Sequence, residues 1–294
     1  MKLTDYKSSA TKRVLIHGIS GSGKSTLAAE MSLHGYKLIW LNIENAADTL
    51  LKLSITAQEN INLINIPDSS SYPIAAQTLL TLFKSGKAQI CNEHGKTSCP
   101  ICARDPESII TSVDFSLLGS NDIVVLDTAT QLSYSIMAYT MKDKSVEIKP
   151  ERDDWGALRK YTEFFKSQFQ GARFNLIVVC QSQEADLEDG VSKLVPSFGS
   201  AGMSAAFGSA FDTVVFTEIK NGKHRAYSKS TASPKFLTRS RSNFAIEDLG
   251  AENLSLLPIF NAEAPVSKAP IVPAPVHGSK AVADLQALAA SLKR

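Results

Sequence analysis

The sequence predicts an α/β protein whose mostly parallel, twisted sheet is flanked by helices. Apolar runs of strand length alternate along the chain with stretches of helical spacing, which is typical of a parallel sheet with helices on both faces. A glycine-rich loop joins the first apolar run to the first helical stretch, and the apolar run 122–126 is followed directly by Asp127. In such folds the functional site lies at the carboxyl ends of the strands, where both features are expected.

The composition is that of a folded globular protein. Of 294 residues, 44% are hydrophobic and 20% are charged, which excludes a wholly disordered, collagen-like or disulfide-stapled chain. The net charge of +2 neither indicates nor excludes a nucleic-acid partner. Residues 1–12 are polar and no apolar run has the length of a membrane-spanning helix, so we expect no secretory signal and no membrane contact. These features predict a cytoplasmic protein.

The expected elements follow one another in strand–helix order. Short apolar runs predict strands at 14–17, 37–43, 61–66, 122–126 and 175–180. Helical spacing predicts helices at 24–33 and 73–83. A further helix is expected to begin at Asp154, as its N-cap, and to end at Gly171, with Trp155, Leu158, Phe165 and Phe169 on one face.

The pattern changes after residue 210. Two strand-like runs at 213–219 and 224–228 flank Asn221-Gly222, which predicts a β-hairpin with a type I′ turn, and a short strand is expected at 235–238. The domain organisation that follows is an arm at 1–12, a core at 13–260, an Ala/Pro-rich linker at 261–278 and an amphipathic helix at 279–294. That last helix would bind a groove on a neighbouring subunit or on a single-strand-binding protein; a disordered, solubilising tail is the alternative.

Residues 18–25 match the phosphate-binding pattern G-x-x-x-x-G-K-[ST], between an expected strand and an expected helix. Backbone N–H groups of such a loop surround phosphate oxygens, and the N-terminus of the helix faces the same anion. Lys24 would reach the β- and γ-phosphates of ATP, and Ser25 would bind Mg²⁺. A chance glycine-rich turn is the alternative. The expected nucleotide-binding residues are Gly18, Ser20, Gly21, Ser22, Gly23, Lys24, Ser25 and Thr26.

Three polar residues directly follow buried-strand patterns. Asp127 would hold Mg²⁺ together with Ser25. Glu44 would orient or deprotonate the attacking water, and Gln181 would sense the γ-phosphate. Because the carboxyl ends of parallel strands share one edge, all three are expected beside the bound nucleotide. Taken singly, Glu44 and Gln181 are equally well explained as helix caps or loop residues.

Four residues of metal-binding types occur within twelve positions, in the pattern Cys91-x-x-His94-x-x-x-x-Cys99-x-x-Cys102. Three thiolates and an imidazole in two tight turns suit tetrahedral Zn²⁺, and four protein ligands leave no open position, which indicates a structural site. We therefore expect a small zinc loop inserted in the core at 88–105. Buried free cysteines or a redox pair are the alternatives. Cys180 lies in a strand pattern and is interpreted as a core residue.

The order and spacing of these motifs resemble those of RecA-like P-loop ATPases. The segment 42–48, with Glu44, resembles the stretch that carries the catalytic glutamate of RecA, and 127–130 resembles its second nucleotide motif. The segment 178–183 is similar to the strand whose glutamine couples the γ-phosphate to a DNA-binding loop. The segment 236–241 is similar to an element of RadA-type proteins. The compact form resembles most the phage RecA-like ATPases of the Sak single-strand annealing group.

The resemblance covers residues 13–244 and implies several functional properties. It implies ATP hydrolysis at subunit interfaces of a ring or filament, with Arg239 and Arg241 reaching the phosphates of a neighbouring subunit. It also implies binding of single-stranded DNA, and a location in the cytoplasm of a bacterial host if a phage encodes the chain. The residues expected to contact DNA are the basic side chains Lys142, Lys144, Lys149 and Arg152 of one loop, with Lys193 and Phe198 of a second.

The predicted function is that of an ATP-dependent, single-stranded-DNA-binding ATPase in recombination or annealing. Acidic residues between the four cations of the first loop leave a solvated charged surface as an alternative to DNA binding there. Other functions remain open for the whole chain: a P-loop helicase or helicase loader, a small-molecule kinase, or a nucleotide-dependent DNA-binding module that does not hydrolyse ATP.

Overall fold

The structure is a computed structural model that describes residues 11–44, 47–69, 72–105, 107–145, 147–186, 192–229, 235–240 and 254–261. The chain divides into two units, residues 1–264 and 265–294, and the second lies outside the described ranges. The predictions for the linker and for the C-terminal helix therefore fall on residues that the structure does not describe.

Within the described residues, nine strands form one mixed sheet, and the predicted fold class is confirmed. The main path runs in the order β10-β9-β1-β7-β6-β2-β3, in which all neighbours except β10 and β9 are parallel. The carboxyl ends of the six parallel strands therefore share one edge. The strands of this path are β1 (Arg13–Gly18), β2 (Lys37–Asn42), β3 (Ile61–Asn65), β6 (Asp122–Asp127), β7 (Asn175–Asp186), β9 (Thr213–Lys220) and β10 (Lys223–Tyr227).

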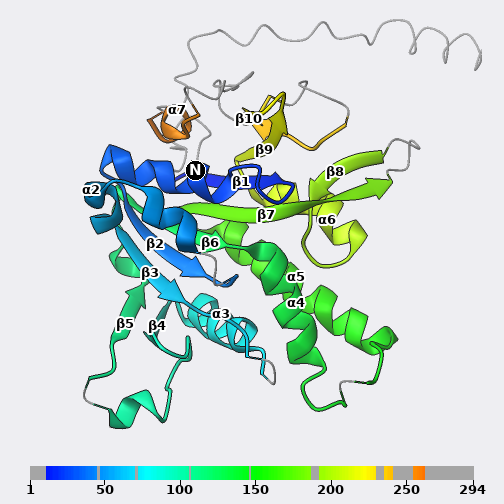
Figure 1. Ribbon diagram of the computed structural model, residues 1–294. Helices are drawn as coiled ribbons and strands as arrows, with labels where there is room; N and C mark the ends of the chain where they lie inside the picture. The colour runs from blue at the N-terminus through cyan, green and yellow to red at the C-terminus, as the bar shows by residue number, and fades with distance from the viewer. Residues whose placement is uncertain are drawn as a thin grey trace, which may run out of the picture. The chain divides into compact units, whose positions relative to one another are not determined.

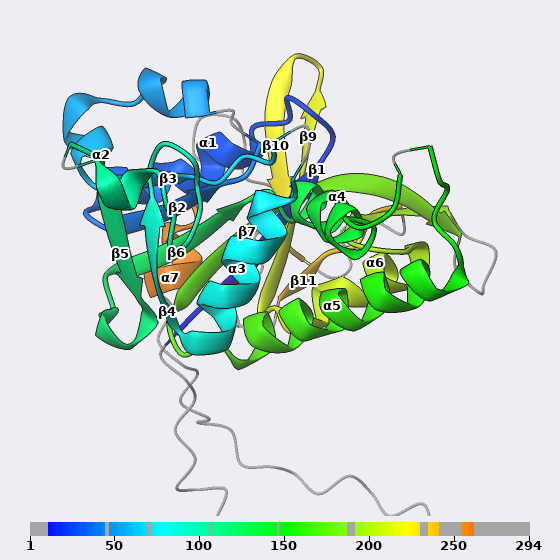
Figure 2. The same cartoon turned by 90° about the horizontal axis from the view of Figure 1, so that it is seen from below.

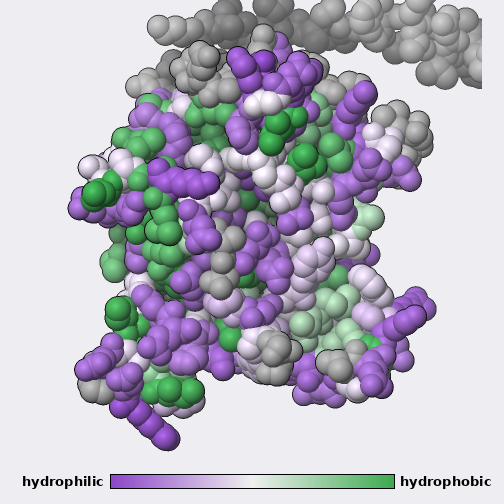
Figure 3. Space-filling view, viewed as in Figure 1, coloured by the Kyte–Doolittle hydropathy of each residue, from purple (hydrophilic) through white to green (hydrophobic). Residues whose placement is uncertain are grey.

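Helices cover both faces of the sheet (Figures 1 and 2). On one face, α1 (Lys24–Ala29) and α7 (Leu257–Asn261) pack with α2 (Ile55–Glu59) nearby; on the other lie α3 (Ile74–Ser85), α4 (Ala129–Thr140), α5 (Arg152–Gly171) and α6 (Ala201–Phe207). Side chains of β7 alternate between the two hydrophobic clusters, with Val178 in one and Val179 in the other, as the two-residue period of a strand requires. The face shown in Figure 3 is mostly hydrophilic, with the hydrophobic residues in separate groups. No described helix is both long enough and apolar enough to cross a bilayer.

Three expected boundaries are corrected by the structure. The first helix ends at Ala29 and continues as a 3-10 helix, Glu30–His34. Asp154 is not the N-cap of α5: the helix begins at Arg152, and Glu151 is the N-cap. Asp154 instead occupies the third helical position, where its carboxylate accepts a hydrogen bond from the Glu151 N–H in a capping box. The last strand, β11, comprises Arg239–Ser240, not 235–238.

Two hairpins extend from the sheet. The predicted hairpin of β9 and β10 is confirmed, since Asn221 and Gly222 have φ angles of 55° and 73°, as a type I′ turn requires. The second hairpin pairs the distal half of β7 with β8 (Ser192–Pro196). It projects on the same side of the molecule as the connection between α4 and α5 (Figures 1 and 2). Both therefore extend from the edge at which the parallel strands end.

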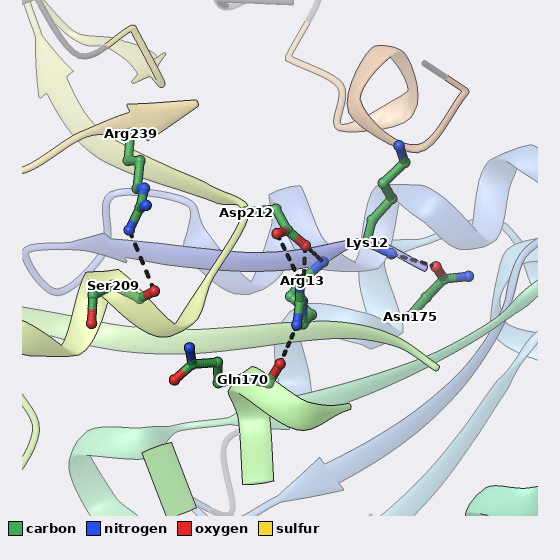
Figure 4. A network of polar contacts seen from close by, with 7 residues as sticks. All are labelled: Lys12, Arg13, Gln170, Asn175, Ser209, Asp212 and Arg239. Carbon is green, nitrogen blue, oxygen red and sulfur yellow. Dashed lines mark hydrogen bonds and ion pairs between the residues drawn. The ribbon is translucent and has the colours of Figure 1, made fainter. Parts of the chain in front are cut away.

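An ion pair between Arg13 and Asp212, both partly buried, links the start of β1 to the start of β9 (Figure 4). The guanidinium of Arg13 donates to Asp212 through Nε (2.9 Å to Oδ2) and Nη2 (2.8 Å to Oδ1), and it also donates to the carbonyl of Gln170. Such a two-pronged pair fixes direction as well as distance. It lies at the amino-terminal edge of the sheet, away from the loop that follows β1.

Candidate functional site

The loop 18–25 connects β1 to α1 and depends on its glycines. Gly23 has a φ angle of 91°, and a Cβ atom there would lie 3.1 Å from Nδ1 of His224. A Cβ atom at Gly18 would lie 2.3 Å from the carbonyl oxygen of Thr217 on β9, which is closer than atoms can approach. Gly18 is therefore required because β9 packs directly against it. Gly23 is required because His224 lies close to it and because its backbone is left-handed.

The ammonium group of Lys24 lies inside this loop. Its Nζ donates to the carbonyl of Gly18 (3.1 Å) and to that of Ile19 (2.7 Å), and the side chain is buried. Burial lowers the pKa of Lys24, and the nearby carboxylates Glu44 and Asp127 oppose that shift. A buried cation held by the carbonyls of a glycine-rich loop at the start of a helix suits the phosphates of a nucleotide.

Asp127, at the end of β6, is buried and carries an oxygen with no partner. Its carboxyl group accepts a hydrogen bond from Ser25, whereas Oδ1 has no hydrogen-bond partner among the described residues. Burial raises the pKa of Asp127 to about 6, against the effect of the Ser25 hydroxyl. A buried carboxylate oxygen left unpaired next to a hydroxyl fits Mg²⁺, which prefers hard oxygen ligands and keeps waters of its own.

Glu44 follows β2 and is held by the residue after Asp127. The hydroxyl of Thr128 donates to Oε1 of Glu44 at 2.7 Å, and the same hydroxyl accepts from the Gln131 N–H as the N-cap of α4. The side chain of Glu44 is exposed. The neighbouring strands β2 and β6 thus bring a fixed, water-accessible carboxylate beside Asp127.

A cavity of about 420 Å³ at the carboxyl edge of the sheet is lined by the phosphate loop and Glu44, whereas Asp127 is not among its lining residues. Gln181 lines it as well: its backbone N–H donates to Thr130 Oγ1 (2.9 Å), and its carbonyl accepts from Ser197 (2.7 Å). The cavity therefore brings together most of the residues expected to form a nucleotide site. Of the expected set, it is lined by Ser20, Gly21, Gly23, Lys24, Ser25, Thr26, Glu44 and Gln181.

His224 also lines this cavity, and the sequence patterns did not indicate it. It lies on β10, and its Nδ1 is 3.1 Å from the carbonyl oxygen of Ser22. Since a carbonyl only accepts, Nδ1 carries the proton. The hairpin of β9 and β10 brings this residue back over the loop from some 200 positions away in the chain. Other lining residues that the patterns missed are Thr49, Lys52, Leu53 and Thr128.

Arg239 lies away from this cavity within its own chain. On β11 it pairs with Val214, which lies beside Leu15, three residues before Gly18 on β1. Its Nη1 donates to the carbonyl of Ser209 at 3.3 Å (Figure 4). A contact of Arg239 with nucleotide would therefore have to reach another subunit. Arg241 lies outside the described residues.

The expected DNA-contacting residues differ in their surroundings. Lys142, Lys149 and Arg152 are exposed in the connection between α4 and α5 and its junction with α5. Lys144 is paired with Asp154 (2.7 Å), whose carboxylate raises the pKa of the lysine. Lys193 is half-buried on β8.

The prediction that Phe198 stacks on a base is wrong for this structure. Its side chain is fully buried, and its ring stacks on that of Phe207 with centroids 4.2 Å apart. The residue lies in the apolar cluster on the face of α5 and α6. Aromatic side chains flanked by small residues occur in loops and cores alike, and here the packing of α6 covers the ring.

The four Cys and His residues of the expected zinc loop meet in space. They lie on and between the strands of a separate antiparallel ribbon, β4 (Lys87–Cys91) and β5 (Ile110–Asp114). Their candidate ligand atoms, on Cys91, His94, Cys99 and Cys102, all lie within 4.8 Å of one another.

The spacing of these atoms fits a metal ion. Nδ1 of His94 is 3.2 Å from Sγ of Cys102 and 3.8 Å from Sγ of Cys99. Ligands at ~2.0–2.3 Å from a tetrahedral zinc ion are separated by about 3.5–3.8 Å from one another. The cluster could hold a zinc ion.

Cys180 belongs to the core, as expected. It is fully buried in β7, where Sγ contacts Thr130 Oγ1 (3.3 Å) and the carbonyl of Ser197 (3.0 Å). Burial raises the pKa of this thiol to about 12. The side chain is therefore a protonated packing group.

Comparison with known proteins gives one family match over most of the chain. A family model described as "AAA domain" matches residues 10–242. No curated protein matches the chain. Among solved structures, a prototypical ATPase from the type III secretion system of pathogenic bacteria is similar at 13% sequence identity with a TM-score of 0.39. The similarity covers 70% of this chain and 52% of that one, so this chain spans about half the length of that protein.

Proposed function

The chain belongs to the AAA domain family of P-loop ATPases, and we propose that it is an ATP-dependent, single-stranded-DNA-binding ATPase of recombination or strand annealing. The observation that carries the proposal is the cavity that collects the phosphate loop, Glu44 and Gln181 at the root of the projecting hairpin of β7 and β8. Gln181 thus links the phosphate loop and Glu44 to a hairpin that can contact another molecule.

Hydrolysis would depend on residues that line the cavity and on Asp127. Lys24 and the loop N–H groups bind the phosphates and stabilise the charge that develops on them. Ser25 and Asp127 would hold Mg²⁺, which neutralises phosphate charge when it is bound. Glu44, oriented by the hydroxyl of Thr128, accepts a proton from the attacking water.

Gln181 would report the state of the nucleotide to the hairpin. It is the residue at which β7 passes beyond its pairing with β1, and pairing with β8 begins at the next residue, Ser182. An amide that gains or loses a hydrogen bond to a γ-phosphate would bias the position of this strand. The hairpin of β7 and β8 would then be the part that moves when the nucleotide changes.

Single-stranded DNA would bind where the hairpin and the connection between α4 and α5 project. The exposed cations Lys142, Lys149 and Arg152 can neutralise backbone phosphates without reading sequence. Lys193, on β8, would add a contact from the hairpin. Lys144 is already paired with Asp154, so it is less available to a DNA phosphate.

Full turnover would require a second subunit. Arg239 does not reach the cavity of its own chain, and we propose that Arg239 and Arg241 act on the nucleotide of a neighbour in a ring or filament. An arginine supplied across an interface stabilises the charge of the transition state. The zinc ion that we propose at the Cys/His cluster would fix the β4–β5 ribbon and take no part in hydrolysis.

The test is ATP hydrolysis by the full chain with and without single-stranded DNA, with Lys24→Ala as the inactive control. We expect hydrolysis to rise when single-stranded DNA is added, and to rise less with duplex DNA. Turnover that requires a small-molecule acceptor would indicate a kinase, and directional unwinding would indicate a helicase. ATP that is bound and retained intact, with or without DNA, would contradict an ATPase.

A further inference from the structure

A second cavity, of about 620 Å³, continues from the phosphate loop along α1. It shares Gly23, Thr26 and His224 with the first cavity. Its volume falls within the ~300–1,000 Å³ of small-ligand sites. His224 borders both cavities. A ligand whose phosphates are bound at the loop could therefore extend past this imidazole into the second cavity.

One face of α1 and of the 3-10 helix that continues it forms one wall of this cavity. Gly23, Leu27, Glu30 and His34 line it at intervals of three or four residues, which places them on one side of the helix. At 1.5 Å per residue, Glu30 lies about 10 Å along the axis from Gly23. The opposite wall comes from residues far away in the sequence and is mostly apolar, with Leu254, Leu257 and Pro258 beside one serine, Ser255.

Glu30 contributes a carboxylate to this cavity, whose other polar lining residues are Thr26, His34, His224 and Ser255. Its Oε1 is hydrogen-bonded to Nε2 of His34, one turn further along the chain. Its Oε2 is buried and has no hydrogen-bond partner among the described residues. Leaving such an oxygen unpaired is costly, so the site favours a ligand that brings an N–H donor to it.

We propose that this cavity binds the base of the nucleotide and that Glu30 selects adenine by accepting a hydrogen bond from its 6-amino group. The inference rests on the proposed ATPase function and adds the residue that determines its base specificity. A planar base would pack against the aliphatic side chains of Leu27 and Leu257, which both line the cavity, and its amino group would supply the donor that Oε2 lacks. His34 holds the carboxylate in place through the other oxygen.

The experiment compares the affinity of the full chain for ATP with its affinity for purine riboside 5′-triphosphate, which lacks only the 6-amino group. Binding is measured by calorimetry for the wild-type protein and for Glu30→Ala, Glu30→Gln and Glu59→Ala. Glu59 is an exposed carboxylate on α2, outside both cavities, and is the matched control. Circular dichroism checks that each variant is folded.

We expect the wild type and Glu59→Ala to bind the purine riboside nucleotide about tenfold or more weakly than ATP, the size of a hydrogen bond to a charged group. Glu30→Ala should bind the two nucleotides alike, and Glu30→Gln should show an intermediate ratio. If the wild type already binds both equally, or binds GTP more tightly than ATP, the inference is overturned while the ATPase proposal stands. If the wild type binds none of these nucleotides, the proposed function fails, and the inference fails with it.

Discussion

Nδ1 of His17 lies 2.9 Å from the hydroxyl of Ser182, so the strand that leads into the phosphate loop is joined to the residue after Gln181. The other ring nitrogen, Nε2, is 2.7 Å from the carbonyl of Leu237 and must donate to it. Nδ1 therefore accepts from Ser182, and the ring is neutral. Burial is the main cause that lowers the pKa of His17 to about 4, since the side chain is fully buried in β1.

The free energy of unfolding should decrease as the pH falls from 6.5 to about 4, because of His17. In the unfolded chain this histidine takes up a proton near its ordinary pKa of 6.5, but in the folded chain it does so only near 4. Between these values the unfolded state binds more protons, so the free energy of unfolding decreases with falling pH, by an amount on the order of 3 kcal/mol at most. Above pH 6.5 the residue contributes no pH dependence.

The measurement is urea unfolding at pH 7 and at pH 4.5 for the wild type and for His17→Gln. The amide of glutamine can still donate to the Leu237 carbonyl but does not titrate. Carboxylates that titrate below pH 5 affect both proteins, so their difference isolates His17. Equal losses of stability in the two proteins would show that His17 is not the group responsible.

Glu44→Gln should leave ATP binding intact and slow hydrolysis by 10²-fold or more, the size of the loss of a general base. The amide keeps the hydrogen bond from Thr128 but cannot accept the proton of the water. Single-turnover hydrolysis, with bound nucleotide measured separately, checks this. Hydrolysis at the parent rate would show that another group activates the water.

Arg241→Ala should lower ATP hydrolysis and leave folding unchanged, because we propose that this side chain acts on a neighbouring subunit. Mixing it with Lys24→Ala should restore part of the activity, since each variant supplies the group that the other lacks. Hydrolysis is measured over a range of mixing ratios, and co-assembly is verified by size. Mixed assemblies that show no recovery would argue against an arginine acting in trans.

The purified chain should contain about one zinc ion, bound by Cys91, His94, Cys99 and Cys102. Replacing Cys99 by Ser should lower the zinc content and destabilise the β4–β5 ribbon, whereas replacing the core residue Cys180 by Ser should leave the zinc content unchanged. Elemental analysis of protein purified without chelators gives the answer. A metal-free wild-type protein that is fully folded would rule out a structural zinc site.

Deletion of residues 262–294 should leave ATP binding and core stability unchanged but weaken assembly or partner loading. The described sheet and both cavities are formed by residues up to 261, which is the reason for the first expectation. Thermal unfolding and the size of DNA complexes are measured for the truncated chain. Loss of folding would mean that the tail packs on the core, and no change in either assay would favour a solubilising tail.

The sequence predicts this sheet well because its strands are short, continuous apolar runs and its phosphate loop has a fixed spacing. It predicts less where a contact depends on segments far apart in the chain. Nothing local in the sequence around His224 indicates that a hairpin returns it to the phosphate loop. Glu30 likewise faces a cavity whose other wall begins at Leu254.

Side-chain exposure was the least predictable property of the candidate site. A lone phenylalanine between small residues is compatible with base stacking or with core packing, and only the position of α6 shows that Phe198 is buried. A lysine in a loop is compatible with phosphate contact or with an ion pair, and the capping position of Asp154 shows why Lys144 is paired. In both cases a neighbouring helix determines the outcome.

The contrast between Cys180 and the Cys/His cluster divides the thiols of the chain into two classes of chemical reactivity. A protonated thiol enclosed in the sheet does not react with alkylating reagents while the protein is folded, because the thiolate is the nucleophile and no reagent reaches it. Thiolates bound to the proposed zinc ion would also be protected, and removal of the ion would free Cys91, Cys99 and Cys102 together. A mass spectrum of the intact, alkylated protein would then separate metal-bound molecules, with no rapidly alkylated cysteine, from metal-free molecules with three.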